Sequence, residues 1–152
     1  MRSAGLHVEP RFCDQVRCLV LRDRRAKDLD EALLPDDRVT FNDFLVSVIA
    51  VLLTPRIGDR SEIEDLAAFS DEVAAAHRSE RRPVNEFVIE ELVRHIYGLP
   101  PLFRTFPAPP TAVSAAGAAI VRYLNNTDTS IAADIDHILD TAEDLHRHRT
   151  RH

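Results

Sequence analysis

The chain has 152 residues, a length typical of one domain and sufficient to bury a hydrophobic core without disulfides or metals. Hydrophobic residues make up 45% of it and charged residues 29%, which excludes an intrinsically disordered protein. The net charge of -6 repels phosphate backbones, so a general nucleic-acid-binding protein is disfavoured. We expect one domain over residues 1–152, with flexible ends near residues 1–9 and 147–152.

The first residues and the two cysteines bear on the cellular location. The opening twelve residues, MRSAGLHVEPRF, lack the apolar stretch of a secretory signal, and we therefore expect a cytoplasmic protein. Cys13 and Cys18 lie five positions apart, a spacing that gives no indication of a disulfide framework. They are expected to be small apolar packing residues or ordinary thiols.

Residues 12–34, FCDQVRCLVLRDRRAKDLDEALL, are open to more than one interpretation. They form one helix broken near residues 22–27, or two helices, or residues 16–22 form a strand, because that stretch is apolar and contains two valines. The basic run from Arg22 to Lys27 carries a local charge of +3. Such a run is typical of a solvated face or a loop, and the alternative is the recognition helix of a DNA-binding regulator.

The most apolar part of the chain is FNDFLVSVIAVLL, residues 41–53. Its uninterrupted portion is too short for a membrane span, which needs about 20 apolar residues. Thr40 is expected to cap a helix at its N-terminus, with Asp43 in the first turn, while Pro55 and Gly58 are expected to end it. A helix that is apolar on every side is buried on every side, so this pattern predicts the central helix of the protein.

Two amphipathic segments follow. Residues 61–77 begin with a capping-box pattern at Ser61, which predicts the start of a helix. Residues 83–98 run from Pro83, which suits a first helical turn, to Gly98, which suits a left-handed helix end.

Two more helical patterns lie near the C-terminus. Residues 111–124 carry a single charge, Arg122, so we expect a helix nearly surrounded by protein that ends at Asn125 and Asn126. Residues 130–145 are cleanly amphipathic, with an apolar face that consists of Ile131, Ile135, Ile138, Leu139, Ala142 and Leu145.

Together these segments predict an all-α protein, a single compact bundle of five or six helices. Residues 44–53 and 112–124 are expected to be its inner helices. Within the second of these, small side chains surround Gly117, and they let another helix approach closely; they are Ala112, Ala115, Ala116 and Ala119.

The segment LPPLFRTFPAPP, residues 99–110, holds five of the nine prolines, which stiffen it into an extended path. A stiff segment loses little entropy when it is held by a partner. We therefore expect Leu102, Phe103 and Phe106 to be partner-binding residues, with at least one of the two phenylalanines partly exposed. The alternative is that both aromatic rings fill the protein's own core.

His137 is a candidate metal ligand because carboxylates lie near it on the same helix; they are Asp136, Asp140 and Asp144. These side chains lie opposite the buried isoleucines of the same helix, so a solvated acidic face is the preferred interpretation, and we expect no metal site and no cofactor. The sequence contains no G-x-S-x-G, no H-E-x-x-H and no glycine-rich phosphate loop, which leaves no positive reason to name an enzyme.

The C-terminal residues HRHRTRH contain Arg147, four intervening residues and His152. This spacing resembles the Arg-x(4–6)-His motif of HEPN-domain ribonucleases, which are helical bundles of about this length. The resemblance covers these two residues and implies a ribonuclease that uses both in catalysis. The chain departs from the motif because Arg149 stands where that family has a polar residue two positions after the arginine. The other interpretation of this tail is a frayed end.

We expect a small non-catalytic protein of the accessory, regulatory or inhibitor type, which binds another protein or itself as a homo-oligomer. A membrane partner is not expected, and nucleic acid is disfavoured by the net charge. The two alternatives are the HEPN-like ribonuclease with Arg147 and His152, and the DNA-binding regulator.

Overall fold

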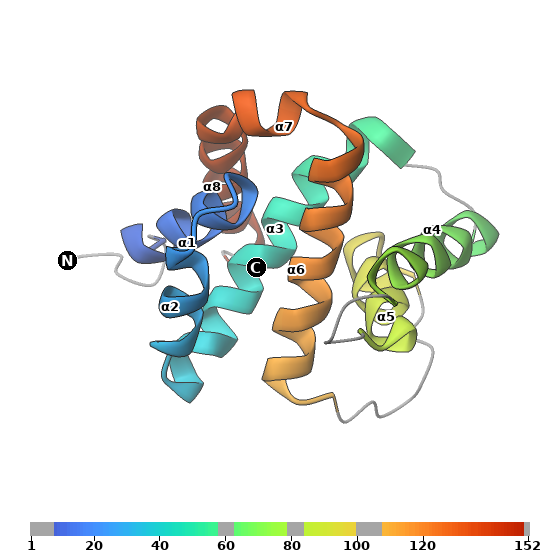
Figure 1. The fold of residues 1–152 in the computed structure, drawn as a ribbon, viewed down its shortest axis with the longest axis horizontal. Helices are drawn as coiled ribbons and strands as arrows, with labels where there is room; N and C mark the ends of the chain where they lie inside the picture. The colour runs from blue at the N-terminus through green and yellow to red at the C-terminus, as the bar shows by residue number, and fades with distance from the viewer. Residues whose placement is uncertain (1–7, 58–62, 79–83, 100–107, 151–152) are drawn as a thin grey trace.

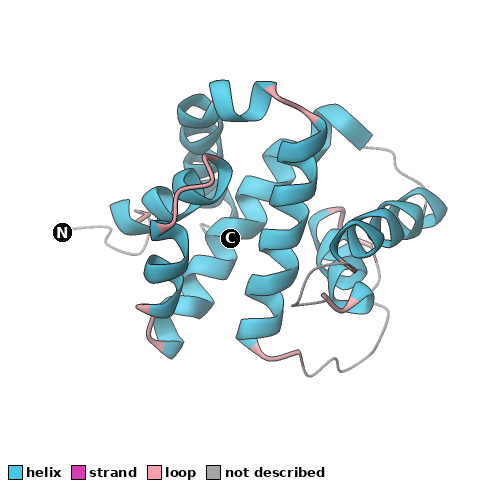
Figure 2. Cartoon of the chain, viewed as in Figure 1, coloured by secondary structure: helices cyan, strands magenta, loops and turns pink. Residues whose placement is uncertain are grey.

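The computed structural model describes residues 8–57, 63–78, 84–99 and 108–150. These residues form helices and contain no strand, which confirms the all-α prediction and excludes the strand alternative for residues 16–22 (Figure 2). In chain order the helices are α1 (Pro10–Val20), α2 (Arg25–Glu31), α3 (Pro35–Ile57), α4 (Ile63–His77), α5 (Glu86–Ile96), α6 (Pro110–Thr127), α7 (Ser130–Ala133) and α8 (Ile135–Thr150).

The described residues hold eight helices, more than the five or six expected. Residues 12–34 form two of them, α1 and α2, separated by a short turn. The predicted helix over residues 130–145 is broken at Asp134, which ends the four-residue α7. The backbone N–H of Asp134 donates to Ser130 O, and its carbonyl then accepts from Ile138 N to start α8.

Helix α3 begins earlier than predicted and runs through Pro55 to Ile57. It begins at Pro35, which suits a first helical turn, and the Asp37 carboxylate accepts a hydrogen bond from the backbone N–H of Leu34. Thr40 therefore lies inside the helix, not at its cap, and its hydroxyl donates to Asp36 O at 3.2 Å. Pro55 lies within the last turn instead of ending the helix.

At the centre of the fold α3 crosses α6 in close contact (Figure 1). Val48, Ile49 and Leu53 of α3 have no exposed surface, and Ile120 and Val121 of α6 have none either. This burial confirms that the two helices are the inner ones. A Cβ atom added to Gly117 would lie 2.5 Å from Leu45 Cδ2, so glycine at this position allows the backbones to approach.

Among the described helices, Pro35–Arg56 of α3 is the one long and apolar enough to cross a membrane, judged by length and composition. More than half of this span is buried inside the protein, however. The helix packs against α6 and α8, and the apolar side chains from Phe41 to Leu53 are buried, apart from the half-buried Ala50 and Val51.

The remaining helices pack around this pair. Helices α1 and α2 lie on one side of α6, and α4 and α5 lie on the other (Figure 1). α8 buries its isoleucines against α3 and leaves Asp136, His137, Asp140 and Asp144 exposed, as the helical spacing predicted. Asn85 caps α5 by accepting from Phe87 N, and Gly98 takes the predicted left-handed conformation with φ 68°.

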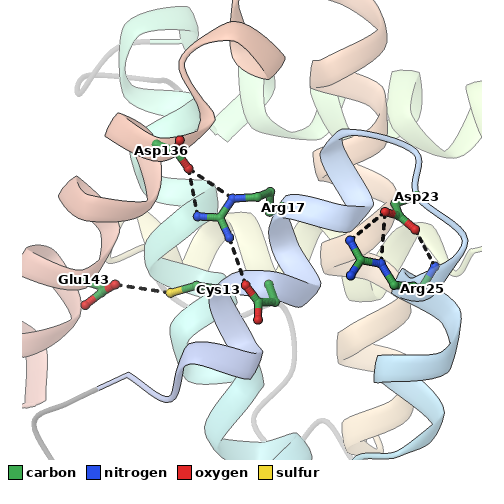
Figure 3. Close-up of polar contacts among 7 residues, drawn as sticks. Cys13, Arg17, Asp23, Arg25, Asp136 and Glu143 are labelled. Carbon is green, nitrogen blue, oxygen red and sulfur yellow. Dashed lines mark hydrogen bonds and ion pairs between the residues drawn. The ribbon is translucent and has the colours of Figure 1, made fainter.

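Polar contacts tie α1 to α8 (Figure 3). Arg17 pairs with Asp136 at 2.8 Å, and the Cys13 thiol donates a hydrogen bond to Glu143 Oε1 at 3.3 Å. Burial, together with that hydrogen bond, raises the pKa of Cys13 to about 12. At neutral pH this sulfur is therefore a protonated thiol with a structural contact, and not a nucleophile.

The last turns of α8 are packed on α3. His146 is buried, and its ring meets the Phe44 ring edge-on with a centroid separation of 6.1 Å. The Arg149 guanidinium donates to Ser47 Oγ at 2.8 Å and to the backbone carbonyl of Asp43. Residues 147–150 belong to α8, and the predicted flexibility of residues 147–152 stays a prediction.

The central position of α3 makes a strong prediction about charge. Ile49→Asp places an unpartnered carboxylate in the core, at a cost on the order of the 5–15 kcal/mol that stabilises a whole domain. We expect this variant to be unfolded or insoluble by circular dichroism. Val39→Asp on the same helix, where the native side chain is 49% exposed, should fold and melt like the parent. A soluble Ile49→Asp protein with the parent's melting curve would contradict the burial of α3.

The buried imidazole of His146 predicts acid sensitivity. Burial lowers its pKa below the usual 6.5, Arg149 lowers it further, and Asp43 opposes the shift. The unfolded chain therefore binds a proton more readily, so this stabilisation is complete above about pH 6.5 and declines as the pH falls below that value. Urea unfolding of the parent should show this decline, and His146→Leu should reduce it. Identical pH slopes in both proteins between pH 6.5 and 5 would contradict the assignment.

Candidate ligand pocket

A pocket of about 610 Å³ lies between α1, the turn that follows it, α2, the first half of α3 and one face of α6. This volume is within the range of small-molecule sites. We call it the α1–α6 pocket. Its wall on one side is α2, which has no buried residue and packs mainly on α1.

The floor of the α1–α6 pocket is apolar. Phe41 and Leu45 of α3 are at most 3% exposed and form its base, with Leu19 of α1 beside them. Ala115 and Ala118 of α6 line it with side chains too short to fill the space. The small residues predicted to allow close approach thus have two roles. Ala115 lines the pocket, whereas Ala116 and Ala119 of the same helix are buried in the core.

A hydrogen-bond network closes one end of the pocket. Arg38 has a side chain only 12% exposed, and its guanidinium donates to the carboxylate and the backbone carbonyl of Asp30, both at 2.8 Å. It also donates to Ser114 Oγ, whose own hydrogen goes to Asn42 Oδ1 at 2.6 Å. Gln15 donates to the same Asp30 carboxylate. These bonds supply partners for polar groups held near the core.

Four further cations line the pocket: Arg22, Arg24, Lys27 and Arg122. We call them the pocket cations. None of them forms an ion pair with a carboxylate of the described residues. The two acidic side chains in the lining are already engaged, since Asp30 holds Arg38 and Asp23 holds Arg25 at 3.0 Å (Figure 3). The hydrogen bonds from Arg25 also lower the pKa of Asp23, so it stays ionised.

The charge of the pocket is opposite to that of the whole protein. Five cationic and two acidic side chains line it, an excess of three positive charges on a chain of net charge -6. The carboxyl ends of α1 and α6 lie beside the pocket and each contribute about half a negative charge. The excess therefore remains close to two positive charges.

The backbone between α1 and α2 places Arg22 at the pocket. Arg22 has φ 59°, the left-handed conformation that glycine normally adopts after a helix. The hydrogen bonds Asp23 N to Cys18 O at 2.8 Å and Arg22 N to Leu19 O complete a Schellman helix end. A side chain at such a position costs on the order of 1–3 kcal/mol, and such residues cluster at functional sites.

Two asparagines of α6 hold this turn. Asn125 donates to Val20 O at 2.9 Å, and Asn126 accepts a hydrogen bond from the Arg22 guanidinium. They were predicted to end the helix, but both lie inside α6, which continues to Thr127.

A second hollow, of about 510 Å³, lies between α3, α4 and α6. Its single arginine, Arg56, is paired with Asp128. Two further carboxylates line it, those of Asp65 and Glu72. It therefore has no uncompensated positive charge and is not comparable with the α1–α6 pocket.

Most of the residues predicted as functional are outside the part of the chain that the structure describes. Leu102, Phe103 and Phe106 are outside the described residues, so their proposed role in partner binding stays a prediction. Arg147 lies on α8 and pairs with Asp144, while His152 is outside the described residues. Within the described ranges no group of three or more His, Cys, Asp or Glu side chains is arranged to hold a metal ion.

The pocket cations were not recognised as a site from the sequence. The sequence predicts a solvated face or a loop for the run from Arg22 to Lys27, and Arg122 stands out in it only as the single charge of its segment. The structure brings them together because the α1–α2 turn folds the run back toward α6. The available indication was the concentration of positive charge directly after an apolar helix in an acidic chain.

No protein-family model, curated protein or solved structure matches this chain. Its function is therefore argued from the geometry of the α1–α6 pocket.

Asp30 is the residue whose loss should most disturb the closed end of the pocket. Asp30→Ala leaves the largely buried Arg38 guanidinium without its carboxylate, and we expect a loss of about 1.5–3 kcal/mol, the range for hydrogen bonds to charged groups. Asp28→Ala on the exposed face of the same helix should change stability by less than about 0.5 kcal/mol. Urea unfolding measures both, and equal effects would contradict the role of the Asp30–Arg38 pair.

Proposed function

We propose that this protein is a non-catalytic binding protein whose α1–α6 pocket takes up a small anionic molecule. The observation that carries the proposal is the set of four pocket cations without carboxylate partners among the described residues. Like charges gathered in one recess repel each other, so a bound anion stabilises the arrangement.

The shape of the site supports a small molecule more than a nucleic acid. A protein that reads DNA projects a helix or a strand pair into the groove. Here Arg22, Arg24 and Lys27 line a recess shared with α6, and the rest of the chain carries a net negative charge. This geometry favours a small molecule that binds inside the recess over a DNA groove into which the protein inserts a helix.

The polar groups of the pocket support binding without chemistry. A hydrolytic enzyme needs a nucleophile and a base that are available to the substrate. The Ser114 hydroxyl is engaged by Asn42 and Arg38, and the Asp30 carboxylate is engaged by Arg38 and Gln15. These side chains act as structural supports for the pocket wall.

Pyrophosphate is a suitable probe because it is a small polyanion. Titration calorimetry should detect its binding, and affinity should fall as salt is raised, because the contacts are ionic. Arg122→Ala should weaken binding about three- to tenfold, between the values for an exposed ion pair and a charged hydrogen bond.

Arg78→Ala is the matched control for this experiment. It removes the same charge from an exposed position beyond the end of α4, outside the pocket lining. We expect its affinity for pyrophosphate to equal that of the parent. Equal weakening in both variants would indicate attraction by net charge alone and would remove the pocket from the proposal.

A further inference from the structure

The α1–α6 pocket is elongated, and one face of α6 gives its direction. The α6 side chains in the lining follow helical spacing along this face; they include Thr111, Ser114, Ala115, Ala118, Arg122 and Asn125. A helix rises 1.5 Å per residue, so these positions extend over about 21 Å. A compact inorganic anion would occupy a small part of this length.

The two ends of this face differ in charge. At the carboxyl end, Arg22 reaches Asn126, and Arg122 lies one helical turn before that asparagine. Both guanidinium groups belong to the pocket cations, and the carboxyl ends of α1 and α6 offset about one of these two positive charges. At the amino end Arg38 is neutralised by Asp30, and Lys27 lies one helical turn before that aspartate on α2.

The stretch between the ends is apolar. Leu19, Phe41 and Leu45 form its base, and Ala115 and Ala118 leave room above it. A bound group that covered this surface would have to be apolar, because a polar group here would lose water without gaining hydrogen bonds.

We infer that the occupant is an amphipathic organic phosphate, with its phosphate between Arg22 and Arg122 and its apolar body along Leu19, Phe41 and Leu45. A phosphate matches this end better than a carboxylate does, because its third oxygen and its second negative charge can engage the second guanidinium group. The inference rests on the proposed function and specifies its ligand class and orientation.

Three soluble probes test this inference by calorimetry on the full chain: hexyl phosphate, glycerol 3-phosphate and hexanol. Each buried methylene is worth about fourfold in affinity, so burial of only two gives more than tenfold. We expect hexyl phosphate to bind at least tenfold more tightly than glycerol 3-phosphate, and hexanol to bind too weakly to measure. Hexyl phosphate is used below the concentration at which it aggregates.

Two classes of variant separate the phosphate end from the apolar body. Arg122→Ala should weaken both phosphates by a similar factor. Ala118→Leu fills the apolar stretch and should weaken hexyl phosphate at least tenfold while glycerol 3-phosphate is unaffected. Ala115→Leu, at an exposed position, gives the same comparison if Ala118→Leu does not fold, and Ala76→Leu on α4 is the matched control.

The outcomes distinguish the two levels of the proposal. Equal affinity for the two phosphates, with binding lost in Arg122→Ala, would leave an anion pocket and overturn the amphipathic ligand. No binding of any phosphate or pyrophosphate would overturn both. A lipid headgroup in a membrane is the other source of an amphipathic phosphate, and sedimentation with phosphatidic acid vesicles tests it. Binding to the vesicles without binding to hexyl phosphate would overturn the soluble ligand.

Discussion

The fold depends on the close approach of α3 and α6 at Gly117, where the Leu45 side chain occupies the space a Cβ atom would need. Because these backbones come so close, the two helices share one core and the other helices pack around them. Leu45 also lines the α1–α6 pocket, next to Phe41. The contact that brings the two inner helices together thus also sets the depth of the pocket floor.

Much of this architecture could be predicted because it depends on local patterns. The run from Phe44 to Leu53 is apolar on every side, and only a central helix can bury it. The isoleucines of α8 repeat at helical spacing, so their burial on one face of the helix could be predicted from the sequence. Helix ends were predicted less well, because competing local contacts decide them: Asp37 and Pro35 start α3 five residues before the expected cap at Thr40.

The pocket could not be predicted in the same way. Its cations come from residues 22–27 and from Arg122, about a hundred positions apart, and only tertiary structure brings them together. The decisive event is a left-handed residue after α1, which sequence reasoning assigns to glycine and asparagine. An arginine there gives no warning that the chain turns back toward α6. A basic run beside a turn and a basic run on a solvated helix have the same appearance in the sequence.

The left-handed backbone of Arg22 has an evolutionary consequence. Glycine would relieve the strain of this position and stabilise the turn, but it would remove one of the charges that face the pocket. Selection for stability and selection for the proposed ligand therefore act in opposite directions on the same codon. In related chains, the identity of the residue at this position becomes a marker: a basic side chain is retained while the pocket is in use, and glycine is free to replace it once that function is lost.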